Sequence, residues 1–201
     1  MDRYSSFAEL SRNEREGRDY AILFRQRDSR LAVIAPHGGR IEPGTLDIAD
    51  ALAGNDFSFY AFEGIKRSGN TVLHLTSSRF DEPVGLTITG NSTVVISVHG
   101  THDRGDTILI GGRNDALKQQ ILEALRSAGF TAEISTKAGL RGSDPTNICN
   151  RGTSGEGVQL EIARGLREKM FDNLSHRPGR KRTQVFYDFI ASIRTVLALW
   201  P

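Results

Sequence analysis

Short apolar runs recur along the chain and are separated by polar, glycine-containing stretches. Their β-branched and aromatic content is typical of buried strands. The predicted strands are "YAILF", "LAVIA", "FSFYAFE", "TVLHLTS", "STVVISVHG", "TILIG", "TAEIST" and "VQLEI". The 21 glycines are spread through the connecting stretches, so we expect many elements joined by tight turns.

Apolar residues at helical spacing identify the remaining elements. Ser6 and Glu9 have the spacing of a capping box for a short helix through about Glu16. Thr45 is placed to cap a second helix, and Asn114 opens the clearest one, "NDALKQQILEALRSAG". The stretch "TQVFYDFIASIRTVLAL" closes the chain as a further helix. Strands interleaved with helices predict an α/β fold of three layers, with a mixed central sheet flanked by helices.

Size and charge narrow the possible partners. The 201 residues fit one domain that spans residues 1–201. Lys and Arg number 26 against 24 Asp and Glu, and this near-balance gives no electrostatic reason to expect a nucleic-acid partner. The one concentrated basic run, "NLSHRPGRKR", is interpreted as a solvated loop before the last helix.

Cysteine and hydropathy limit the chemistry and the location. Cys149 is the only cysteine, which excludes an internal disulfide and a cysteine-based zinc cluster, and we interpret it as a small buried residue. No apolar stretch reaches the roughly 20 residues that span a bilayer, and the first residues are too polar for a secretory signal. We therefore expect synthesis in the cytoplasm, no membrane association, and release by a route such as host lysis.

Candidate metal ligands stand where two predicted strands end, and ligands of open α/β sheets bind beyond the carboxyl ends of strands. His37 follows "LAVIAP" and His99 follows "STVVISV", each before a glycine that lets the backbone turn away. Glu42 comes after Gly38 and Gly39, close enough to fold back beside His37. Two imidazoles and a carboxylate suit a catalytic zinc, although histidines at strand ends are also common as hydrogen-bonded structural residues. The chain lacks HExxH, which excludes the helical metalloprotease arrangement.

Glu161, in "GVQLEIARG", is the candidate general base. It alternates with Gln159 onto one side of the predicted strand, opposite the apolar positions. A carboxylate beside zinc-bound water can take its proton and pass it to the leaving nitrogen. The alternative is a glutamate on a solvent-facing side of the strand.

Arginines and a further histidine are candidates for substrate binding. Arg151 and Arg113 lie in glycine- and asparagine-rich loops, where a guanidinium could neutralise an oxyanion or bind a substrate carboxylate. Arg164 is a weaker candidate, and all three could be ordinary surface arginines. His74, midway through "TVLHLTS", is interpreted as a core residue or as a residue that supports the ligands.

An ordered series of segments resembles the phage and prophage poly-γ-glutamate hydrolase family over almost the whole chain. The segments are "YSSFAELSRNEREGRDY", "APHGGRIEPGT", "FSFYAFEGIKRSGN", "LHLTSSRFDEP", "VVISVHG", "GGRN", "NICNRG" and "GVQLEIARGLR". The resemblance implies a fold similar to zinc carboxypeptidases. It also implies hydrolysis of the γ-amide links of poly-γ-glutamate, a polyanionic capsule or slime polymer of some bacilli.

The same resemblance implies roles for individual residues. His37, Glu42 and His99 would bind zinc, and Glu161 would be the general base and then the acid for attack by a zinc-activated water. Asn150 and Arg151 resemble the asparagine-arginine pair that holds the substrate carboxylate in carboxypeptidases. Carboxypeptidases proper use His-x2-Glu and place that pair before the second histidine, whereas here the spacing is His-x4-Glu and the pair follows His99. We expect a monomer with a shallow cleft.

Two alternatives remain open at this stage. The zinc site could serve deacylation of small N-acyl amino acids, as in aspartoacylase-like proteins. The chain could instead be a non-catalytic phage or prophage protein that binds nucleic acid through "RPGRKR", although no stacking aromatics accompany that run. Substrate comparison would separate the first alternative, and salt-dependent DNA binding without hydrolysis would favour the second.

Overall fold

A mixed sheet of seven strands forms the centre of the computed structural model, which describes residues 2–175 and 179–201. The strands are β1 (Tyr20–Arg25), β2 (Leu31–Gly39), β3 (Ser58–Gly64), β4 (Val94–Gly100), β5 (Ile108–Gly112), β6 (Ala132–Ile134) and β7 (Val158–Ile162). Their order across the sheet is β1-β3-β2-β4-β7-β5-β6. The central four, β3, β2, β4 and β7, run parallel, while β1 and β5 are antiparallel to their inner neighbours. The carboxyl ends of β2, β4 and β7 therefore meet at one edge.

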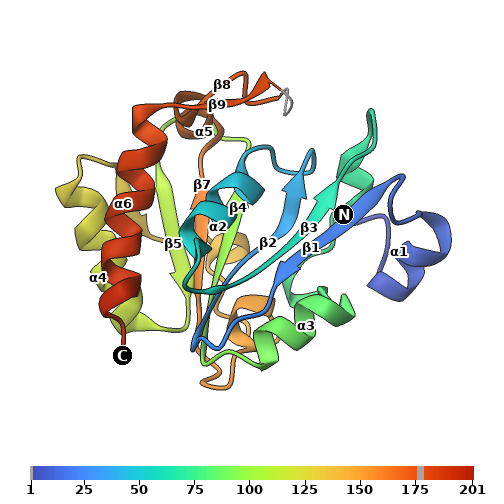
Figure 1. Cartoon of the computed structure of the whole chain (residues 1–201), viewed down its shortest axis with the longest axis horizontal. Coiled ribbons are helices and arrows are strands. Elements are labelled where there is room, and N and C mark those ends of the chain that lie inside the picture. The colour runs from blue at the N-terminus through green and yellow to red at the C-terminus, as the bar shows by residue number, and fades with distance from the viewer. Residues whose placement is uncertain (1, 176–178) are drawn as a thin grey trace.

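Helices cover both faces of the sheet, as the three-layer prediction requires (Figure 1). One face carries α2 (Thr45–Ala53), α4 (Asp115–Ser127), α5 (Arg164–Met170) and α6 (Gln184–Leu199). The other carries α1 (Phe7–Asn13), α3 (Pro83–Gly90) and the 3-10 helices η1 (Asn70–Leu73), η2 (Ser77–Arg79) and η4 (Ile148–Asn150). The remaining elements are η3 (Ala138–Leu140), β8 (Phe171–Asp172) and β9 (Lys181–Arg182).

Alternation along the central strands builds one apolar core on each face. On β3, Phe59 and Ala61 join the core beneath α2 and α6, whereas Tyr60 and Phe62 join the core beneath α1 and α3. Because both faces are covered, these strands are apolar at almost every position. The predicted α/β fold with a mixed sheet is confirmed.

The caps of the helices explain where they begin. The Ser6 hydroxyl accepts a hydrogen bond from the Glu9 N–H, as predicted, but the Glu9 carboxylate accepts from Ser5 N–H and the helix ends at Asn13. Asn114 caps α4 through the N–H of Leu117, which confirms that prediction. Thr45 is the first residue of α2 rather than its cap. Gly44 occupies the cap position with a φ of 96°, which a side chain would strain.

The prediction of a strand for "TVLHLTS" is wrong. Residues 70–73 and 77–79 form 3-10 turns, and Leu73 and Leu75 are buried in the core beneath α1 and α3. The apolar residues that suggested a strand pack against one face of the sheet, and the segment itself is not a strand of it. The next helix, α3, was not predicted, although Pro83 at its first turn and the Glu82 carboxylate, which accepts from two backbone N–H groups, are a start signal.

The basic run before α6 differs from the predicted solvated loop. Residues 176–178 lie outside the described part of the chain, so the prediction is assessed on the rest. The Arg180 side chain is 3 % exposed, bonds the Asp47 carboxylate at 2.5 Å and lies over the Phe171 ring. Lys181 and Arg182 form β9. At least one guanidinium of the run is therefore a buried structural group.

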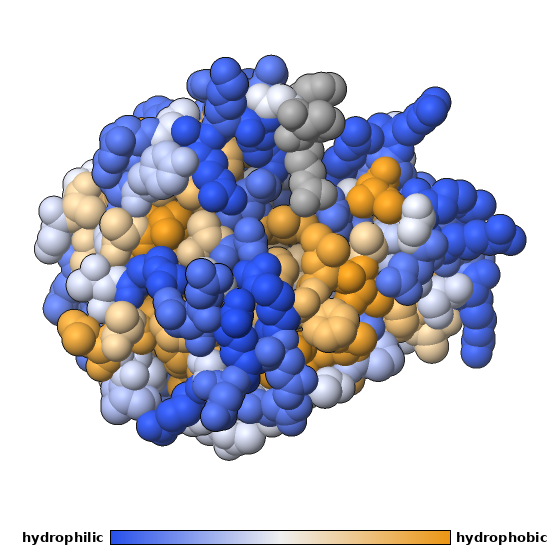
Figure 2. Space-filling view, viewed as in Figure 1, coloured by the Kyte–Doolittle hydropathy of each residue, from blue (hydrophilic) through white to orange (hydrophobic). Residues whose placement is uncertain are grey.

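Strand β1 forms one edge of the sheet. Apolar side chains gather near β1 on the face shown in Figure 2. On this edge strand Phe24 is 55 % exposed. Ile22, Leu23, Leu46 and Phe59 lie around the same shallow depression. Within the described ranges, no helix combines the length and the apolar character that crossing a bilayer demands.

Candidate metal centre and catalytic cleft

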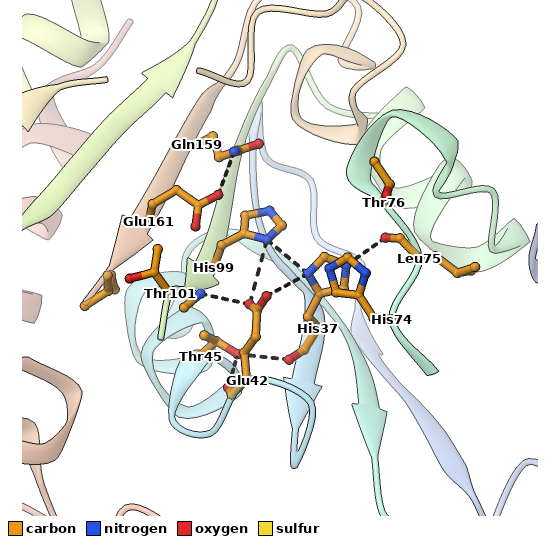
Figure 3. A network of polar contacts seen from close by, with 12 residues as sticks. His37, Glu42, Thr45, His74, Leu75, Thr76, His99, Thr101, Gln159 and Glu161 are labelled. Carbon is orange, nitrogen blue, oxygen red and sulfur yellow. Dashed lines mark hydrogen bonds and ion pairs between the residues drawn. The ribbon is translucent and has the colours of Figure 1, made fainter. Parts of the chain in front are cut away.

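A cleft of about 590 Å³ opens where β2, β4 and β7 end (Figure 3). Its floor holds His37, Glu42, His99 and Glu161. One wall is formed by the segment around residues 74–78, and the facing wall by the segment of residues 138–147, which we call the cleft loop. These polar side chains meet at the carboxyl ends of the strands, which is the position predicted from the sequence.

His37 is fixed in one tautomer by its surroundings. Its Nε2 lies 2.8 Å from the carbonyl oxygen of Leu75, so Nε2 carries the hydrogen and donates it. Nδ1 therefore presents a lone pair to the cleft. The pairing of β2 with β3 shifts register between Ala35 and Gly38, and irregularities of this kind re-aim side chains.

Glu42 returns to His37 through a closed turn. The Glu42 N–H donates to the carbonyl of His37 at 3.0 Å, which brings the carboxylate back over the strand end. Gly39 has a φ of 67°, and a Cβ there would lie 2.6 Å from the carbonyl oxygen of Gly64 on β3. This glycine thus serves the contact with the neighbouring strand as well as the turn, so replacing it would disturb both.

Three acceptor atoms converge in the cleft and fit a metal ion. His37 Nδ1 lies 3.1 Å from Glu42 Oε1 and 3.1 Å from His99 Nδ1, and His99 Nδ1 lies 3.8 Å from Glu42 Oε2. Ligands at about 2.0–2.2 Å from a tetrahedral centre stand about 3.3–3.6 Å apart, close to these values. Two nitrogens and a carboxylate oxygen would repel one another without a positive charge between them. The donor set of His37, Glu42 and His99 therefore suits a divalent metal.

The charge states of Glu42 and His99 agree with ligand roles. Burial lowers the pKa of His99 to about 3, so this imidazole is neutral and its lone pair is available. Burial alone would raise the pKa of Glu42, but the His37 and His99 rings and the Gly100 N–H outweigh it and hold the pKa at about 2. Burial disfavours a charged His37, yet the adjacent Glu42 raises the His37 pKa overall. Glu42 is accordingly the ionised member of the set.

Glu161 stands beside the three groups on the next strand. It is the register partner of His99 in the β4–β7 ladder, and it is 6 % exposed, so the solvent-facing alternative is wrong. Burial raises its pKa to about 8, and the negative charge of Glu42 contributes to the rise. Its Oε1 accepts a hydrogen bond from the Gln159 amide at 2.8 Å. The cleft therefore contains a buried carboxyl group whose proton affinity is high.

His74 stacks on His37 with 4.0 Å between the ring centroids, so it supports that ring and also lines the cleft. Its Nδ1 donates to the Asp2 carboxylate at 2.8 Å, which also accepts from Thr76 N–H and from Arg79. Burial of Asp2 would raise its pKa, but the bonds from Thr76 and His74 lower the pKa to about 2. Asp2, close to the N-terminus, thus holds one wall of the cleft in place through these bonds.

Asn150 and Arg151 lie behind the cleft loop. The Asn150 amide donates to the carbonyls of Gly142 and Asp144 and accepts from Gly157 N–H, so its hydrogen-bonding groups are used within the chain. Arg151 donates its Nε to the carbonyl of Thr146. Neither is among the described residues that line the cleft, and a substrate-binding role for them stays a prediction.

Arg113 and Arg164 also lie outside the described lining of the cleft. Arg113 is exposed beyond the end of β5. Arg164 makes an ion pair with Glu168 one turn along α5 at 2.7 Å. Their predicted contacts with substrate carboxylates likewise stay predictions.

Arg167, which the sequence did not predict, bonds the backbone beneath the cleft. It is 3 % exposed and donates to the carbonyls of Pro43 (2.5 Å), Thr101 (2.6 Å) and Ile162 (3.2 Å). These carbonyls lie on the three segments that carry Glu42, His99 and Glu161. Burial lowers the pKa of Arg167 to about 10, and the charges of Glu42 and Glu161 favour its charged form. Arg167 therefore joins the segments that form the floor.

Two solved structures of low sequence identity share the fold of this chain. With 11 % identity and a TM-score of 0.53, the chain is similar in fold to an N-formylglutamate amidohydrolase from Ralstonia eutropha, covering 89 % of this chain and 95 % of that one. With 11 % identity and a TM-score of 0.51, it is also similar to a putative carboxypeptidase from Burkholderia mallei, covering 89 % and 58 %. The chain therefore shares its fold with these two proteins.

Closer relatives identify the family. The model of the poly-gamma-glutamate hydrolase family matches residues 4–192, and the chain belongs to this family of enzymes. A structure of a bacteriophage poly-gamma-glutamate hydrolase is 35 % identical, with a TM-score of 0.94 over 98 % of this chain and 97 % of that one. A zinc-free structure of YndL is 36 % identical, with a TM-score of 0.94 over 99 % and 98 %. The UPF0714 protein YmaC of Bacillus subtilis (strain 168) is 38 % identical over 98 % of this chain and 84 % of its own length.

Proposed function

We propose that this enzyme is a zinc-dependent amidohydrolase that cleaves the γ-glutamyl amide bonds of poly-γ-glutamate. The observation that carries the proposal is the convergence of His37 Nδ1, His99 Nδ1 and the Glu42 carboxylate beside a buried Glu161. The family match supports the substrate, and the zinc-free form in which a close relative is described supports zinc as the metal.

His37, Glu42 and His99 would hold the zinc, and they suit it because nitrogen and oxygen donors are its usual ligands. When bound, the ion would supply a Lewis acid that lowers the pKa of water to about 7 and polarises the scissile carbonyl. The remaining steps belong to the chain itself. The Leu75 carbonyl and the His74 ring keep His37 aligned, and the Gly100 N–H keeps Glu42 aligned.

Glu161 would move the proton. Its carboxylate accepts a proton from the attacking water and later donates it to the leaving nitrogen, so one group serves as base and then as acid. In the metal-free protein the pKa of Glu161 is raised to about 8, so this group can gain and lose a proton near neutral pH. A divalent cation nearby would favour the ionised form that the first step needs. Two steps thus require a carboxyl group in this place.

The walls would bind the polymer chiefly through hydroxyl and backbone groups. Thr76, Ser77 and Ser78 line one wall, and Ser143 lines the facing one. Hydroxyls and backbone N–H groups can donate to the α-carboxylates that stand beside each scissile amide. The part of the lining that the structure describes contains no lysine or arginine.

The decisive experiment combines metal analysis with polymer digestion. Wild-type protein is expected to bind one zinc per chain and to shorten poly-γ-glutamate, measured by loss of viscosity and by gel filtration. His99→Ala is expected to lose both properties while it keeps the far-ultraviolet circular dichroism of the fold. Wild-type protein that digests the polymer at the same rate after complete removal of metal would overturn the proposal.

The substrate alternatives are tested in the same assay. Oligo-γ-glutamate should be cleaved far faster than small N-acyl amino acids, and the reverse order would assign the site to deacylation. Family membership and the enzyme class leave the nucleic-acid alternative without support. A DNA-binding titration across salt concentrations, with hydrolysis measured in parallel, checks it.

A further inference from the structure

A row of buried side chains connects Glu161 to the cleft loop. Asn147, Gln159 and Glu161 are 6 %, 3 % and 6 % exposed. Asn147 Nδ2 donates to Gln159 Oε1 at 2.8 Å, and Gln159 Nε2 donates to Glu161 Oε1 at 2.8 Å. Gln159 and Glu161 are two residues apart on β7 and share one side of the strand, so both reach the floor of the cleft (Figure 3).

Asn147, at the end of the row away from Glu161, sets which way the two side-chain amides face. Asn147 caps η4, where its Oδ1 accepts from the backbone N–H of Cys149 at 3.1 Å. The two ends of an amide are alike in shape, so hydrogen-bond partners decide which way it faces. A backbone N–H can only donate, and Asn147 must therefore turn its Nδ2 toward Gln159. Gln159 must in turn present Oε1 to Asn147 and Nε2 to Glu161.

We infer that Gln159, oriented by Asn147, is a positioning residue that keeps Glu161 Oε1 as a hydrogen-bond acceptor and so assigns the transferred proton to Oε2. This inference rests on the proposed role of Glu161 as base and acid. The second oxygen is turned away from Gln159 in Figure 3. The backbone of the cleft loop closes over Gln159, because a Cβ on Gly142 would lie 3.1 Å from its side chain.

The row changes how each proton step proceeds. In the first step an O–H bond of the attacking water breaks as its oxygen bonds the carbonyl carbon, and Oε2 takes the proton. In the second step the C–N bond breaks, and Oε2 returns the proton to the departing nitrogen. Without the Gln159 donor, either oxygen could hold the proton and the carboxyl group could rotate. A fraction of molecules would then carry the proton on Oε1 instead of Oε2.

Gln159→Leu removes the donor and keeps the approximate volume. We expect kcat on oligo-γ-glutamate to fall about 10- to 100-fold, the range typical when a group that orients a site residue is lost. KM should stay within about twofold, and zinc content should remain one per chain. A raised KM with an unchanged kcat would identify Gln159 as a substrate contact instead and would overturn the inference.

Asn147→Asp tests the direction of the row from one residue further away. Aspartate is also a good cap, so the bond from Cys149 N–H and the start of η4 should persist. The group that faces Gln159 becomes an acceptor, so the Gln159 amide should turn over and offer its oxygen to Glu161. We expect kcat to fall by about tenfold with little change in KM, although the substituted side chain does not touch Glu161.

The double variant separates the row from a simple charge effect. In the Gln159→Leu background the same Asn147→Asp change adds the same charge but has no amide to turn over. We expect little further loss of kcat there, and an equal loss in both backgrounds would overturn the inference. Melting temperatures of all variants, compared with wild type, show whether each one folds.

A second readout does not depend on catalysis. In the metal-free protein the side-chain amide hydrogens of Gln159, assigned by their loss in Gln159→Leu, should exchange slowly with solvent in nuclear magnetic resonance spectra. Asn147→Asp should shift their signals. If wild-type protein fails to cleave the polymer but keeps these signals, the proposed function fails and the hydrogen-bonded row stands. If it cleaves the polymer and the signals exchange freely, the row fails alone.

Discussion

Two buried glutamates lie in the same cleft and meet opposite environments. Glu42, in the turn after β2, receives a backbone N–H from Gly100 and lies against two imidazoles, and its pKa is held at about 2. Glu161, on β7, receives one neutral amide and lies within the field of Glu42, and its pKa is raised to about 8. Burial is the largest single influence on both and acts in the same direction.

The difference teaches how one cleft assigns two tasks to one residue type. A carboxylate that stays ionised at every ordinary pH suits a permanent ligand, whereas one that exchanges a proton near neutrality suits an acid-base role. The neighbouring groups decide the pKa of each buried carboxyl group. Several hydrogen-bond donors are needed to lower it, whereas it stays raised where donors are few. The same substitution, glutamate to glutamine, made at Glu42 and at Glu161 in turn should therefore distinguish their two roles.

The largest expected effect is loss of the ligand. Glu42→Gln removes the negative charge between His37 and His99 and keeps the size of the side chain. Zinc content should fall from one per chain to near zero, and hydrolysis of poly-γ-glutamate should fall to background. Metal analysis after dialysis and a digestion assay measure the two quantities. Full zinc content in Glu42→Gln would remove Glu42 from the ligand set.

The same chemical change at the other glutamate should spare the metal. Glu161→Gln is expected to keep one zinc per chain and to lower kcat about 10²- to 10⁴-fold, the usual contribution of a general acid-base group. Steady-state kinetics on oligo-γ-glutamate, with zinc measured on the same samples, checks this. Hydrolysis at the wild-type rate would show that Glu161 moves no proton in the reaction.

Arg167 allows an intermediate test, because it lies near both glutamates. Arg167→Lys keeps the positive charge but cannot reach the carbonyls of Pro43, Thr101 and Ile162 together. Arg167→Met loses the charge as well. We expect kcat to fall about tenfold in the first variant and further in the second. Equal losses in both would mean that the bonds to the backbone matter and the charge does not.

The smallest expected effect concerns stability of the metal-free protein. A folded-state pKa near 8 against an ordinary value of 4.5 means that folding retains a proton that the unfolded chain releases. Stability contributed by protonated Glu161 is therefore complete below about pH 4.5 and is lost as the pH rises toward 8. Glu161→Gln should melt a few degrees higher than wild type at pH 8, since about 1 kcal/mol shifts a chain of this size by about 2–4 °C. The two proteins should melt alike at pH 4.5, and identical melting at both values would contradict the raised pKa.

Much of the fold and the floor of the cleft follow from local patterns in the sequence. The central strands are apolar on both faces, which leaves a continuous run such as residues 31–35, and polar residues directly after such runs must meet at one edge of a parallel sheet. That reasoning brought His37, Glu42 and His99 together, whereas Glu161 was placed by the alternation of side chains within its own strand. The alternation on β7 also placed Gln159 beside Glu161, although its role became visible only with the partner on the cleft loop.

The walls and the supporting residues could not be predicted in the same way. Asp2 bonds His74 across 72 positions, a contact that no local pattern records. Arg167 has the spacing of an ordinary surface cation on a short helix, and only the three-dimensional approach of three backbone segments makes it a buried donor. Such contacts depend on tertiary structure, which sequence periodicity does not encode.

The register between β4 and β7 sets His99 and Glu161 at the same level on neighbouring strands. Their separation is thus a property of the backbone ladder, whose spacing of about 4.8 Å is common to all sheets. Both walls of the cleft, by contrast, are short turns and loops, which tolerate changes in length and sequence. An engineer who wished to give this enzyme a different polyamide substrate could therefore exchange the segments around residues 74–78 and 138–147, while keeping Asn147, and leave the distance between His99 and Glu161 as it is.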